Sequence, residues 1–240
     1  MSVKKTVFIS GTSRGIGKST AELFAQRGWN VIAHARASSP EFERFTTELA
    51  SQCDVTITPV YFDMRDESAM KEAVKSAIYE PKRTVDALVN NAGICDIGLF
   101  MLTSMKNIRD VFDVNLFSHM RLTQLILKRM PKGGAIVNVA SVDGLEFKRG
   151  ESAYGSSKAA LLAWTQILRL ELLGQVRVNA IAPGTVDTDM AKSIESKAVW
   201  KGMTPIMAPM EVSKTIYYLS SDDASAVSGA ILKITGELEL

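Results

Sequence analysis

Cysteine and histidine, the residue types that most often build disulfide scaffolds and metal sites, are scarce in this chain. Its 240 residues contain two cysteines, Cys53 and Cys95, and two histidines, His34 and His119. The cysteines stand far apart and have no second pair, which argues against a disulfide scaffold and a cysteine-based zinc site and fits a reducing compartment. Neither histidine has a plausible partner ligand, so the sequence predicts no metal.

An excess of charge and a long apolar run are also absent. The 28 lysine and arginine residues nearly balance the 26 aspartate and glutamate residues, and the net charge of +2 is too small to predict a nucleic-acid or anionic-membrane surface. The apolar stretch Thr6–Ser10 is shorter than the roughly 7–15 residues of a secretory signal. No window approaches the roughly 20 residues of a membrane span. We therefore expect a soluble cytoplasmic protein that binds neither nucleic acid nor membranes.

What the sequence does contain is a regular alternation of short apolar runs and longer segments with helical periodicity. The runs predict strands at Thr6–Ser10, Asn30–Ala35, Val55–Phe62, Val85–Asn90, Ala135–Ala140, Val176–Ala182 and Ala230–Ile234. The segments between them predict helices at Gly17–Arg27, Glu41–Gln52, Glu67–Tyr79, Met105–Met130, Ser152–Leu173 and Glu211–Ser220, the fourth of which is either continuous or interrupted. Several runs are continuously apolar, as in parallel strands buried on both faces. This order predicts one α/β domain over residues 1–240, a doubly wound, parallel, seven-stranded sheet flanked by helices.

Residues 186–210 lack clear periodicity and contain prolines, Gly202 and several methionine and tryptophan side chains. In an open α/β sheet, ligands bind beyond the carboxyl ends of the strands. A mobile apolar segment after a strand is therefore a candidate substrate lid, and its adaptable thioethers would suit an apolar substrate. The alternative interpretation is a surface loop packed by its own side chains.

A glycine-rich turn joins the first predicted strand to the first predicted helix. Its glycines are Gly11, Gly15 and Gly17. Glycines at such a junction let the backbone approach a pyrophosphate, whose charge is met by the helix N-terminus. A P-loop needs four residues between its glycines, and the spacing here excludes a P-loop nucleoside triphosphatase. The turn therefore predicts a dinucleotide site.

The residues after the second predicted strand indicate which dinucleotide binds. A carboxylate about 20 residues beyond such a turn would accept the ribose 2′-hydroxyl of NAD, whereas an arginine suits the 2′-phosphate of NADP. Arg36 directly follows that strand, and no Asp or Glu occurs in residues 29–39. Together with Arg14 in the turn, Arg36 can form charge-assisted hydrogen bonds to a phosphate. The sequence therefore predicts NADP(H), with NAD(H) as the less favoured alternative.

Tyr154 and Lys158 are four residues apart in a segment of helical periodicity and so share one helix face. A free tyrosine has a pKa of about 10, and a neighbouring ammonium would lower that pKa toward working pH. Such a phenol can give a proton to a carbonyl oxygen during hydride delivery, or remove one from an alcohol. Ser141 follows the fifth strand at the sheet edge where that carbonyl would lie, and can hydrogen-bond the same oxygen.

Taken together and in this order, these motifs resemble those of the short-chain dehydrogenase/reductase family, in particular the compact members that include 3-oxoacyl carrier-protein reductases. The resemblance covers almost the whole chain. It rests on the glycine turn, Asp63, Asn90-Asn91-Ala92-Gly93, Asn115, Ser141, Tyr154, Lys158 and Pro183-Gly184. It implies a Rossmann-type fold and an oxidoreductase that transfers a hydride between NADP(H) and a carbonyl or secondary-alcohol substrate.

The resemblance also implies a role for each matching residue. Tyr154 is the general acid/base, Ser141 positions the substrate oxygen, and Lys158 binds the nicotinamide ribose and lowers the pKa of the tyrosine. Asn115 interrupts its helix so that a water can link Lys158 to solvent. The implied cofactor-binding residues are Gly11, Ser13, Arg14, Gly15, Ile16, Gly17, Arg36, Asp63, Asn90, Ala92, Gly93, Tyr154, Lys158, Pro183, Gly184, Thr185 and Thr188.

The sequence leaves the substrate class open. Leu170 stands where carrier-protein reductases usually have an arginine, so a 3-oxoacyl thioester and a polar sugar or ring ketone are both retained as substrates. The segment between Ser141 and Tyr154 is unusually charged, with Asp143, Glu146, Lys148, Arg149 and Glu151. If these side chains face the substrate, they would orient a polar one; a solvated loop is the other interpretation.

Two further points stay open. A chain that kept the fold without catalysis would be an NADP-binding regulator or scaffold, although the retained Asn115, Ser141, Tyr154 and Lys158 favour an enzyme. The resemblance implies a homotetramer. The sequence Ile234-Thr235-Gly236-Glu237 departs from the family pattern in a region that commonly packs between subunits, so we expect a homo-oligomer that is a tetramer or a dimer.

Overall fold

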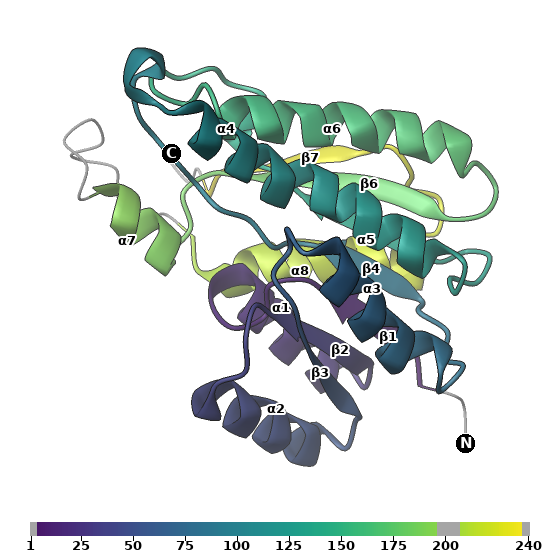
Figure 1. The fold of residues 1–240 in the computed structure, drawn as a ribbon. Coiled ribbons are helices and arrows are strands. Elements are labelled where there is room, and N and C mark those ends of the chain that lie inside the picture. The colour runs from purple at the N-terminus through teal and green to yellow at the C-terminus, as the bar shows by residue number, and fades with distance from the viewer. Residues whose placement is uncertain (1–3, 196–206, 237–240) are drawn as a thin grey trace.

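Seven parallel strands form one sheet in the computed structural model, which describes residues 4–195 and 207–236. The strands are β1 (Thr6–Ile9), β2 (Asn30–Ala35), β3 (Ile57–Tyr61), β4 (Ala87–Asn90), β5 (Ala135–Val139), β6 (Arg177–Pro183) and β7 (Ile231–Ile234). Their order across the sheet is β3-β2-β1-β4-β5-β6-β7, and Figure 1 shows the helices that surround them. The predicted doubly wound parallel sheet is confirmed.

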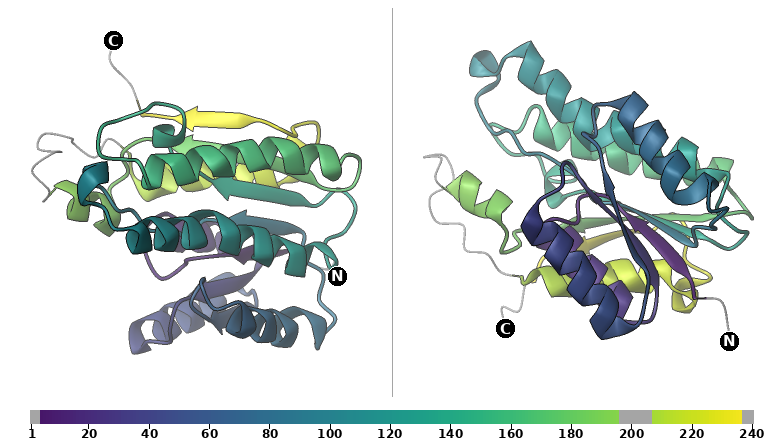
Figure 2. Two further views of the ribbon diagram at one scale, coloured as in Figure 1. Left: turned by 45° about the horizontal axis from the view of Figure 1, so that its top comes forward. Right: turned by 60° about the horizontal axis from the view of Figure 1, so that its bottom comes forward.

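Helices cover both faces of the sheet, as the right-hand view of Figure 2 shows most clearly. One layer contains α1 (Gly15–Gln26), α2 (Pro40–Cys53) and α8 (Pro209–Ser220). The opposite layer contains α3 (Glu67–Val74), α4 (Met105–Phe112), α5 (Ser118–Leu127) and α6 (Tyr154–Glu171). Short 3₁₀ turns occur at Phe100–Leu102, Val142–Gly144 and Asp222–Ala224. None of the helices in the described ranges is long and apolar enough to cross a membrane.

The core consists of two apolar layers, one on each face of the sheet. Successive side chains of a strand point to opposite faces. Val7 and Ile9 of β1 therefore pack with Phe24 of α1, whereas Phe8 packs with Leu122 of α5. All of these side chains are buried, and each contributes about 1.5–3 kcal/mol on removal from water. This is why the strands are continuously apolar rather than alternating.

Two of the predicted helices each contain a π-helical segment. The predicted helix Met105–Met130 is α4, a π-helical segment Asp113–Phe117, and then α5. The predicted helix Glu67–Tyr79 is α3 followed by a second π-helical segment, Lys75–Tyr79. Periodicity alone does not distinguish a helix with one widened turn from a regular helix. Widened turns of this kind are frequent at functional sites, and the first one contains Asn115.

The segment proposed as a lid contains a helix that the sequence did not predict. This helix, α7 (Asp189–Glu195), follows a turn in which the Thr188 hydroxyl accepts the Ala191 amide hydrogen at 3.4 Å. Val186 forms a parallel bridge with Met207, so the described ends of the segment lie side by side. Residues 196–206 lie outside the described residues, and the role of the segment as a lid stays a prediction.

The two histidines are buried hydrogen-bonding residues. Nδ1 of His34 accepts the Gly11 amide hydrogen at 3.0 Å, and Nε2 donates to the Phe62 carbonyl oxygen at 2.9 Å. Nε2 of His119 lies 2.7 Å from the Ala92 carbonyl oxygen. Within the described part of the chain, no group of three or more His, Cys, Asp and Glu side chains could hold a metal ion. His34 thus joins the turn after β1 to the segment after β3.

We expect His34 to make the stability of the fold depend on acidity. Burial lowers the pKa of His34 from 6.5 to about 4. The unfolded chain therefore takes up a proton first as the pH falls, and stability decreases between about pH 6.5 and 4, whereas above pH 6.5 this effect is absent. Each such histidine contributes a slope of about 1.4 kcal/mol per pH unit. His34→Gln should remove that slope from urea unfolding curves measured across this range, and an identical slope would contradict the assignment.

Candidate functional site

A cavity of about 960 Å³ follows the carboxyl edge of the sheet, past the point where the strand order reverses between β1 and β4. Open α/β sheets bind ligands at this topological switch point. Most residues predicted for the site line it: Gly11, Ser13, Arg14, Gly15, Ile16, Gly17, Arg36, Asp63, Ala92, Gly93, Ser141, Tyr154, Lys158, Pro183, Gly184, Thr185 and Thr188. The other two, Asn90 and Asn115, are not among the described residues that line the cavity.

The glycine turn is shaped by backbone contacts that exclude larger residues. A Cβ atom at Gly17 would lie 2.0 Å from the Gly11 carbonyl oxygen and 2.5 Å from Nδ2 of Asn91. Gly15 has a φ of +56°, a left-handed conformation that favours glycine. The N-cap of α1, Arg14, makes no side-chain cap hydrogen bond in the described structure. The first amides of α1 are therefore available to a negatively charged group such as a pyrophosphate.

Ser10 and Asn91 hold this turn against β4. The Ser10 hydroxyl accepts the amide hydrogens of Asn91 and Ala92, each at 2.9 Å. In return, Nδ2 of Asn91 donates to the carbonyl oxygens of Ser10 and Gly11, at 2.9 and 3.1 Å. These bonds satisfy backbone groups that lie between the two strands. The turn and the end of β4 thus form one rigid wall of the cavity.

Asn90, which we expect to be a cofactor-binding residue, lies off the cavity lining of the described residues, and its contact with the cofactor stays a prediction. Asn90 is buried in the middle of the sheet, and its Nδ2 donates to Oδ1 of Asn138 at 2.8 Å and to the Thr123 hydroxyl at 3.2 Å. Asn91, one residue later, lines the cavity. Because side chains alternate along a strand, a shift of one residue moves an amide from the sheet interior to the cavity.

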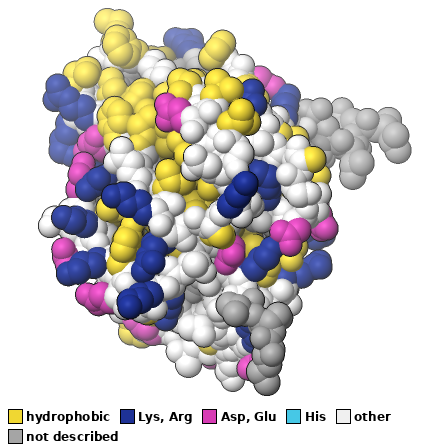
Figure 3. Space-filling view, turned by 90° about the vertical axis from the view of Figure 1, so that its right-hand side faces the viewer, with side chains coloured by type: hydrophobic (Ala, Val, Ile, Leu, Met, Phe, Trp, Pro, Cys, Tyr) yellow, Lys and Arg dark blue, Asp and Glu magenta, His cyan; other side chains and the backbone are white. Residues whose placement is uncertain are grey.

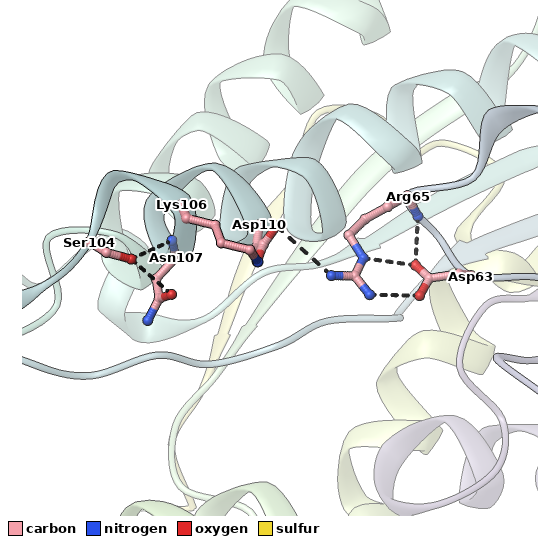
Figure 4. Close-up of polar contacts among 6 residues, drawn as sticks. All are labelled: Asp63, Arg65, Ser104, Lys106, Asn107 and Asp110. Atoms are coloured by element: carbon pink, nitrogen blue, oxygen red, sulfur yellow. Dashed lines mark hydrogen bonds and ion pairs between the residues drawn. The ribbon is translucent and has the colours of Figure 1, made fainter.

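An arginine that the sequence motifs did not single out holds Asp63 in place. Nε and Nη2 of Arg65 donate to the two carboxylate oxygens of Asp63, at 3.0 and 2.7 Å. Mainly through these hydrogen bonds, Arg65 holds the pKa of Asp63 down at about 2. Nη1 of Arg65 also lies 3.9 Å from Oδ1 of Asp110 in α4, as Figure 4 shows. The signal in the sequence was an arginine two residues after an aspartate, at the same edge of the sheet.

The first turn of α4 completes the polar row drawn in Figure 4. The Ser104 hydroxyl caps the helix by accepting the Asn107 amide hydrogen at 3.1 Å. Lys106, in the same turn, forms an ion pair at 2.6 Å with Asp110, which lies one turn later. Asp110 therefore lies between two cations, Lys106 on its own helix and Arg65 after β3. The row connects the segment after β3 to α4.

Tyr154 begins α6, and Lys158 follows on the same face one turn later. Lys158 is 3% exposed, and its Nζ donates to the Val139 carbonyl oxygen at 2.9 Å. Nζ also lies 5.8 Å from the centre of the Tyr154 ring. Ser141, which follows β5, lines the same end of the cavity as Tyr154. Two elements far apart in the sequence thus bring the three predicted groups to one end of the cavity.

The electrostatics of this pair differ from the sequence-based expectation. We expected Lys158 to lower the pKa of Tyr154, but burial raises that pKa above its ordinary value. Burial also lowers the pKa of Lys158, to about 8. Both shifts have the same cause, because removal from water disfavours the charged form of each group. In this state of the protein, the phenol is therefore protonated at neutral pH.

Asn115 lies behind the cavity rather than on it. It is buried within the π-helical segment, where its Nδ2 donates to the Ile94 carbonyl oxygen and to the Ser157 hydroxyl, both at 3.0 Å. Its Oδ1 accepts the Ile94 amide hydrogen at 2.9 Å. A Cβ at Gly93 would lie 3.3 Å from this Oδ1 and 3.6 Å from Nζ of Lys158. Asn115 and Lys158 therefore approach the same glycine, and the proton relay stays a prediction.

Part of the charged segment before Tyr154 faces the cavity. Asp143, Lys148 and Glu151 line it, whereas the exposed Glu146 forms an ion pair with Lys233. Oδ1 of Asp143 lies 2.6 Å from Nζ of Lys148, and its Oδ2 accepts the Ser141 hydroxyl hydrogen at 3.1 Å. The loop is therefore charged on its cavity side as well as on its solvent side, in contrast to the interpretation as a purely solvated loop.

Similarity to known proteins extends over nearly the whole chain. The family model described as short chain dehydrogenase matches residues 5–199. The chain is 35% identical over 242 residues to a 3-oxoacyl-acyl-carrier-protein reductase of Thermotoga maritima, and this alignment covers 98% of this chain and 97% of that protein. It is 35% identical over 251 residues to the oxidoreductase UcpA of Escherichia coli, with coverage of 97% and 93%. A solved short-chain dehydrogenase/reductase of the glucose/ribitol dehydrogenase type from Brucella melitensis has a TM-score of 0.88 at 26% identity, covering 98% and 97%.

We expect Gly17→Ala to damage the turn without unfolding the chain. The added methyl group would collide with the Gly11 carbonyl oxygen, so the turn must shift and its amides lose their alignment. Affinity for NADPH, measured by fluorescence titration, should fall by about tenfold or more. Gly28→Ala is the control for a strained backbone without a collision: Gly28, unlike Gly17, has a positive φ, of +79°, and a Cβ there has no neighbour within 4 Å among the described atoms, so this variant should lose stability and keep its affinity. Equal affinities of the two variants would mean that the close packing of Gly17 does not shape the dinucleotide site.

Proposed function

Because this chain belongs to the short-chain dehydrogenase family, whose members are oxidoreductases of alcohol and carbonyl groups, we propose that it is an NADP(H)-dependent carbonyl reductase or alcohol dehydrogenase. The observation that carries the proposal is the position of Tyr154, Ser141 and Lys158 at one end of a cavity that continues to the glycine turn. Its small-molecule substrate is a ketone or the corresponding secondary alcohol.

The residues along the cavity suit a nicotinamide dinucleotide at each of its parts. The uncapped start of α1 would hold the pyrophosphate, Asp63 would contact the adenine, and Arg36 would pair with the 2′-phosphate. Lys158 and the segment 183–188 would hold the nicotinamide ribose and ring. Both carboxylate oxygens of Asp63 accept hydrogen bonds from Arg65. Arg36 would therefore pair with the phosphate rather than with that carboxylate. The bound coenzyme would supply or accept the hydride.

Tyr154 would supply the proton that completes the reduction. Its phenol donates a proton to the carbonyl oxygen while the carbonyl carbon gains the hydride, so that a ketone becomes a secondary alcohol. Ser141, whose hydroxyl hydrogen is donated to Asp143 in this structure, would turn that hydrogen to the same carbonyl oxygen. The ammonium of Lys158, whose pKa is about 8, stabilises the phenolate that remains. Asn115 and Lys158 both lie next to Gly93, and a water held between them would return the proton from solvent.

Two substrate classes agree with different observations. The similarity to a 3-oxoacyl-acyl-carrier-protein reductase supports a 3-oxoacyl thioester. The charged cavity wall of Asp143, Lys148 and Glu151 supports a polar ring ketone or a sugar. A regulator or scaffold without catalysis is less consistent with the site, because it would have no need of a buried lysine beside a tyrosine.

We also propose that the protein is a cytoplasmic homo-oligomer, a tetramer or a dimer. Several large apolar side chains are exposed, including Met101 at 94% and Leu102 at 82% between β4 and α4. Others lie near the end of α6, at Ile167, Leu170 and Leu173. Figure 3 shows hydrophobic side chains gathered in the upper part of one face, and large exposed apolar patches are typical of subunit contacts. Cys53 and Cys95, both within the described residues, form no disulfide, which agrees with a reducing compartment.

Tyr154→Phe tests the proton donor. The variant keeps the ring and the cavity, so NADPH binding should persist, while turnover of a reducible ketone should fall by roughly 100-fold or more. Tyr218→Phe, at a half-exposed tyrosine on α8, is the matched control and should keep full activity. Undiminished turnover in Tyr154→Phe would remove the tyrosine from the mechanism.

Arg36→Asp tests the choice of coenzyme. A carboxylate at the end of β2 would repel the 2′-phosphate and accept the 2′-hydroxyl of NADH instead. The ratio of kcat/KM for NADPH to that for NADH should therefore fall by at least about tenfold. Arg44→Asp, at an exposed arginine of α2, applies the same charge change away from the cavity and should leave the ratio unchanged. If both variants keep the wild-type ratio, Arg36 does not set the preference.

A further inference from the structure

One charged side chain beside the proposed proton donor is buried without a partner. Glu151 lies three residues before Tyr154, where the chain enters α6, and is one of the residues that line the cavity. Only 4% of this residue is exposed, and neither carboxylate oxygen has a hydrogen-bond partner among the described residues. A buried polar group without a hydrogen bond reduces the stability of the fold, and a buried charge reduces it more. Nothing in the reaction described above uses this carboxylate.

The charged groups around Glu151 do not neutralise it. One carboxylate oxygen of Asp143 accepts a hydrogen bond from Lys148, and the other accepts one from Ser141. Burial is the main reason that the pKa of Glu151 is raised to about 7; the negative charge of Asp143 raises it further, and the positive charge of Lys148 acts in the opposite direction. When Glu151 ionises, this wall of the cavity therefore has an excess of negative charge.

The backbone of α6 keeps Glu151 in this position. The Gly155 amide donates to the Glu151 carbonyl oxygen at 2.9 Å. A Cβ at Gly155 would lie 2.9 Å from the Asp143 carbonyl oxygen and 3.6 Å from Oε2 of Glu151. Glycine thus allows the start of α6, the loop of Asp143 and the carboxylate to pack together. The burial of Glu151 is therefore a feature of the packing at the start of α6.

We propose that Glu151 selects a substrate that carries a positively charged nitrogen in addition to its carbonyl group. The proposal rests on the proposed function, because it concerns the substrate end of the same cavity. A cation beside a carboxylate in a cavity with low-dielectric walls is attracted more strongly than in water. The cation also supplies the opposite charge that the fold lacks there. A neutral hydroxyl would leave the negative charge unbalanced, and an acyl chain would bury it further.

Two ketones of the same shape differ in charge, and the change in preference between the wild type and Glu151→Gln cancels the difference in their intrinsic reactivity. They are 1,1-dimethyl-4-oxopiperidinium, a permanent cation, and 4,4-dimethylcyclohexanone, its neutral counterpart. Oxidation of NADPH gives kcat/KM for each ketone, and we expect the wild type to prefer the cation. Glu151→Gln keeps the shape of the side chain and removes its charge, so the preference should fall by about tenfold. An unchanged preference in this variant, or a wild type that prefers the neutral ketone, overturns the proposal.

Two further variants separate the charge of Glu151 from a general disturbance. Lys148→Met removes a positive charge from the same wall and should increase the preference for the cation. Glu146→Gln is the matched control, because Glu146 is exposed, pairs with Lys233 and lies off the cavity lining of the described residues, so it should leave the preference unchanged. A shift in the same direction in Glu151→Gln and Lys148→Met overturns the proposal, as does an equal shift in Glu146→Gln. Lys148→Met supplies the test if Glu151→Gln does not fold.

Binding keeps the proposal testable if neither ketone is reduced. The two corresponding alcohols, 1,1-dimethyl-4-hydroxypiperidinium and 4,4-dimethylcyclohexanol, are then titrated calorimetrically into the enzyme with NADP⁺. Tighter binding of the cation, weakened in Glu151→Gln, supports the selection by Glu151, while the lack of turnover counts against the proposed reductase function. Equal binding of the two alcohols overturns the selection whatever the turnover shows.

Discussion

The contact between the glycine turn and the end of β4 is the constraint on which the cavity depends. Gly17 packs against the Gly11 carbonyl oxygen so closely that no side chain fits, and the Asn91 amide bridges the backbones of Ser10 and Gly11. His34 binds the same turn from β2. Three strands thus meet at one turn, and the uncapped start of α1 points its amides at the space in front of it.

Burial sets the chemistry at the other end of the cavity. The same desolvation keeps Tyr154 protonated and brings the pKa of Lys158 to about 8. A protonated phenol is the form needed to reduce a carbonyl, and a nearby ammonium stabilises the phenolate formed afterwards. In the proposed reaction, the tyrosine would give up its proton only after a substrate and a coenzyme had changed its surroundings.

The two ends of the cavity differ in charge. Arg36 lines the end beside β2, where a phosphate is expected, whereas Asp143, Lys148 and Glu151 line the end beside Tyr154. Asp143 pairs with Lys148, which leaves Glu151 as the unpaired charge of these three. In a cavity with low-dielectric walls, this difference would orient a ligand before any close contact forms. An anionic dinucleotide and a cationic ketone would then enter the cavity with complementary orientations.

The sheet, the family and a set of site residues of which most line the cavity could be predicted from the chain alone, because continuous apolar strands, a glycine turn and a Tyr-Lys pair one turn apart are local patterns. The family resemblance is confirmed by the match over residues 5–199. The interruption of the helix at Asn115 was implied by the family resemblance and is present as a π-helical segment. Local patterns did not reveal the second π-helical segment at Lys75–Tyr79, the position of Asn91 on the cavity, the pairing of Arg65 with Asp63 or the direction of the Tyr154 pKa shift. Each of these depends on which groups the fold removes from water and which distant segments it brings together, and neighbouring residues in the chain carry no record of either.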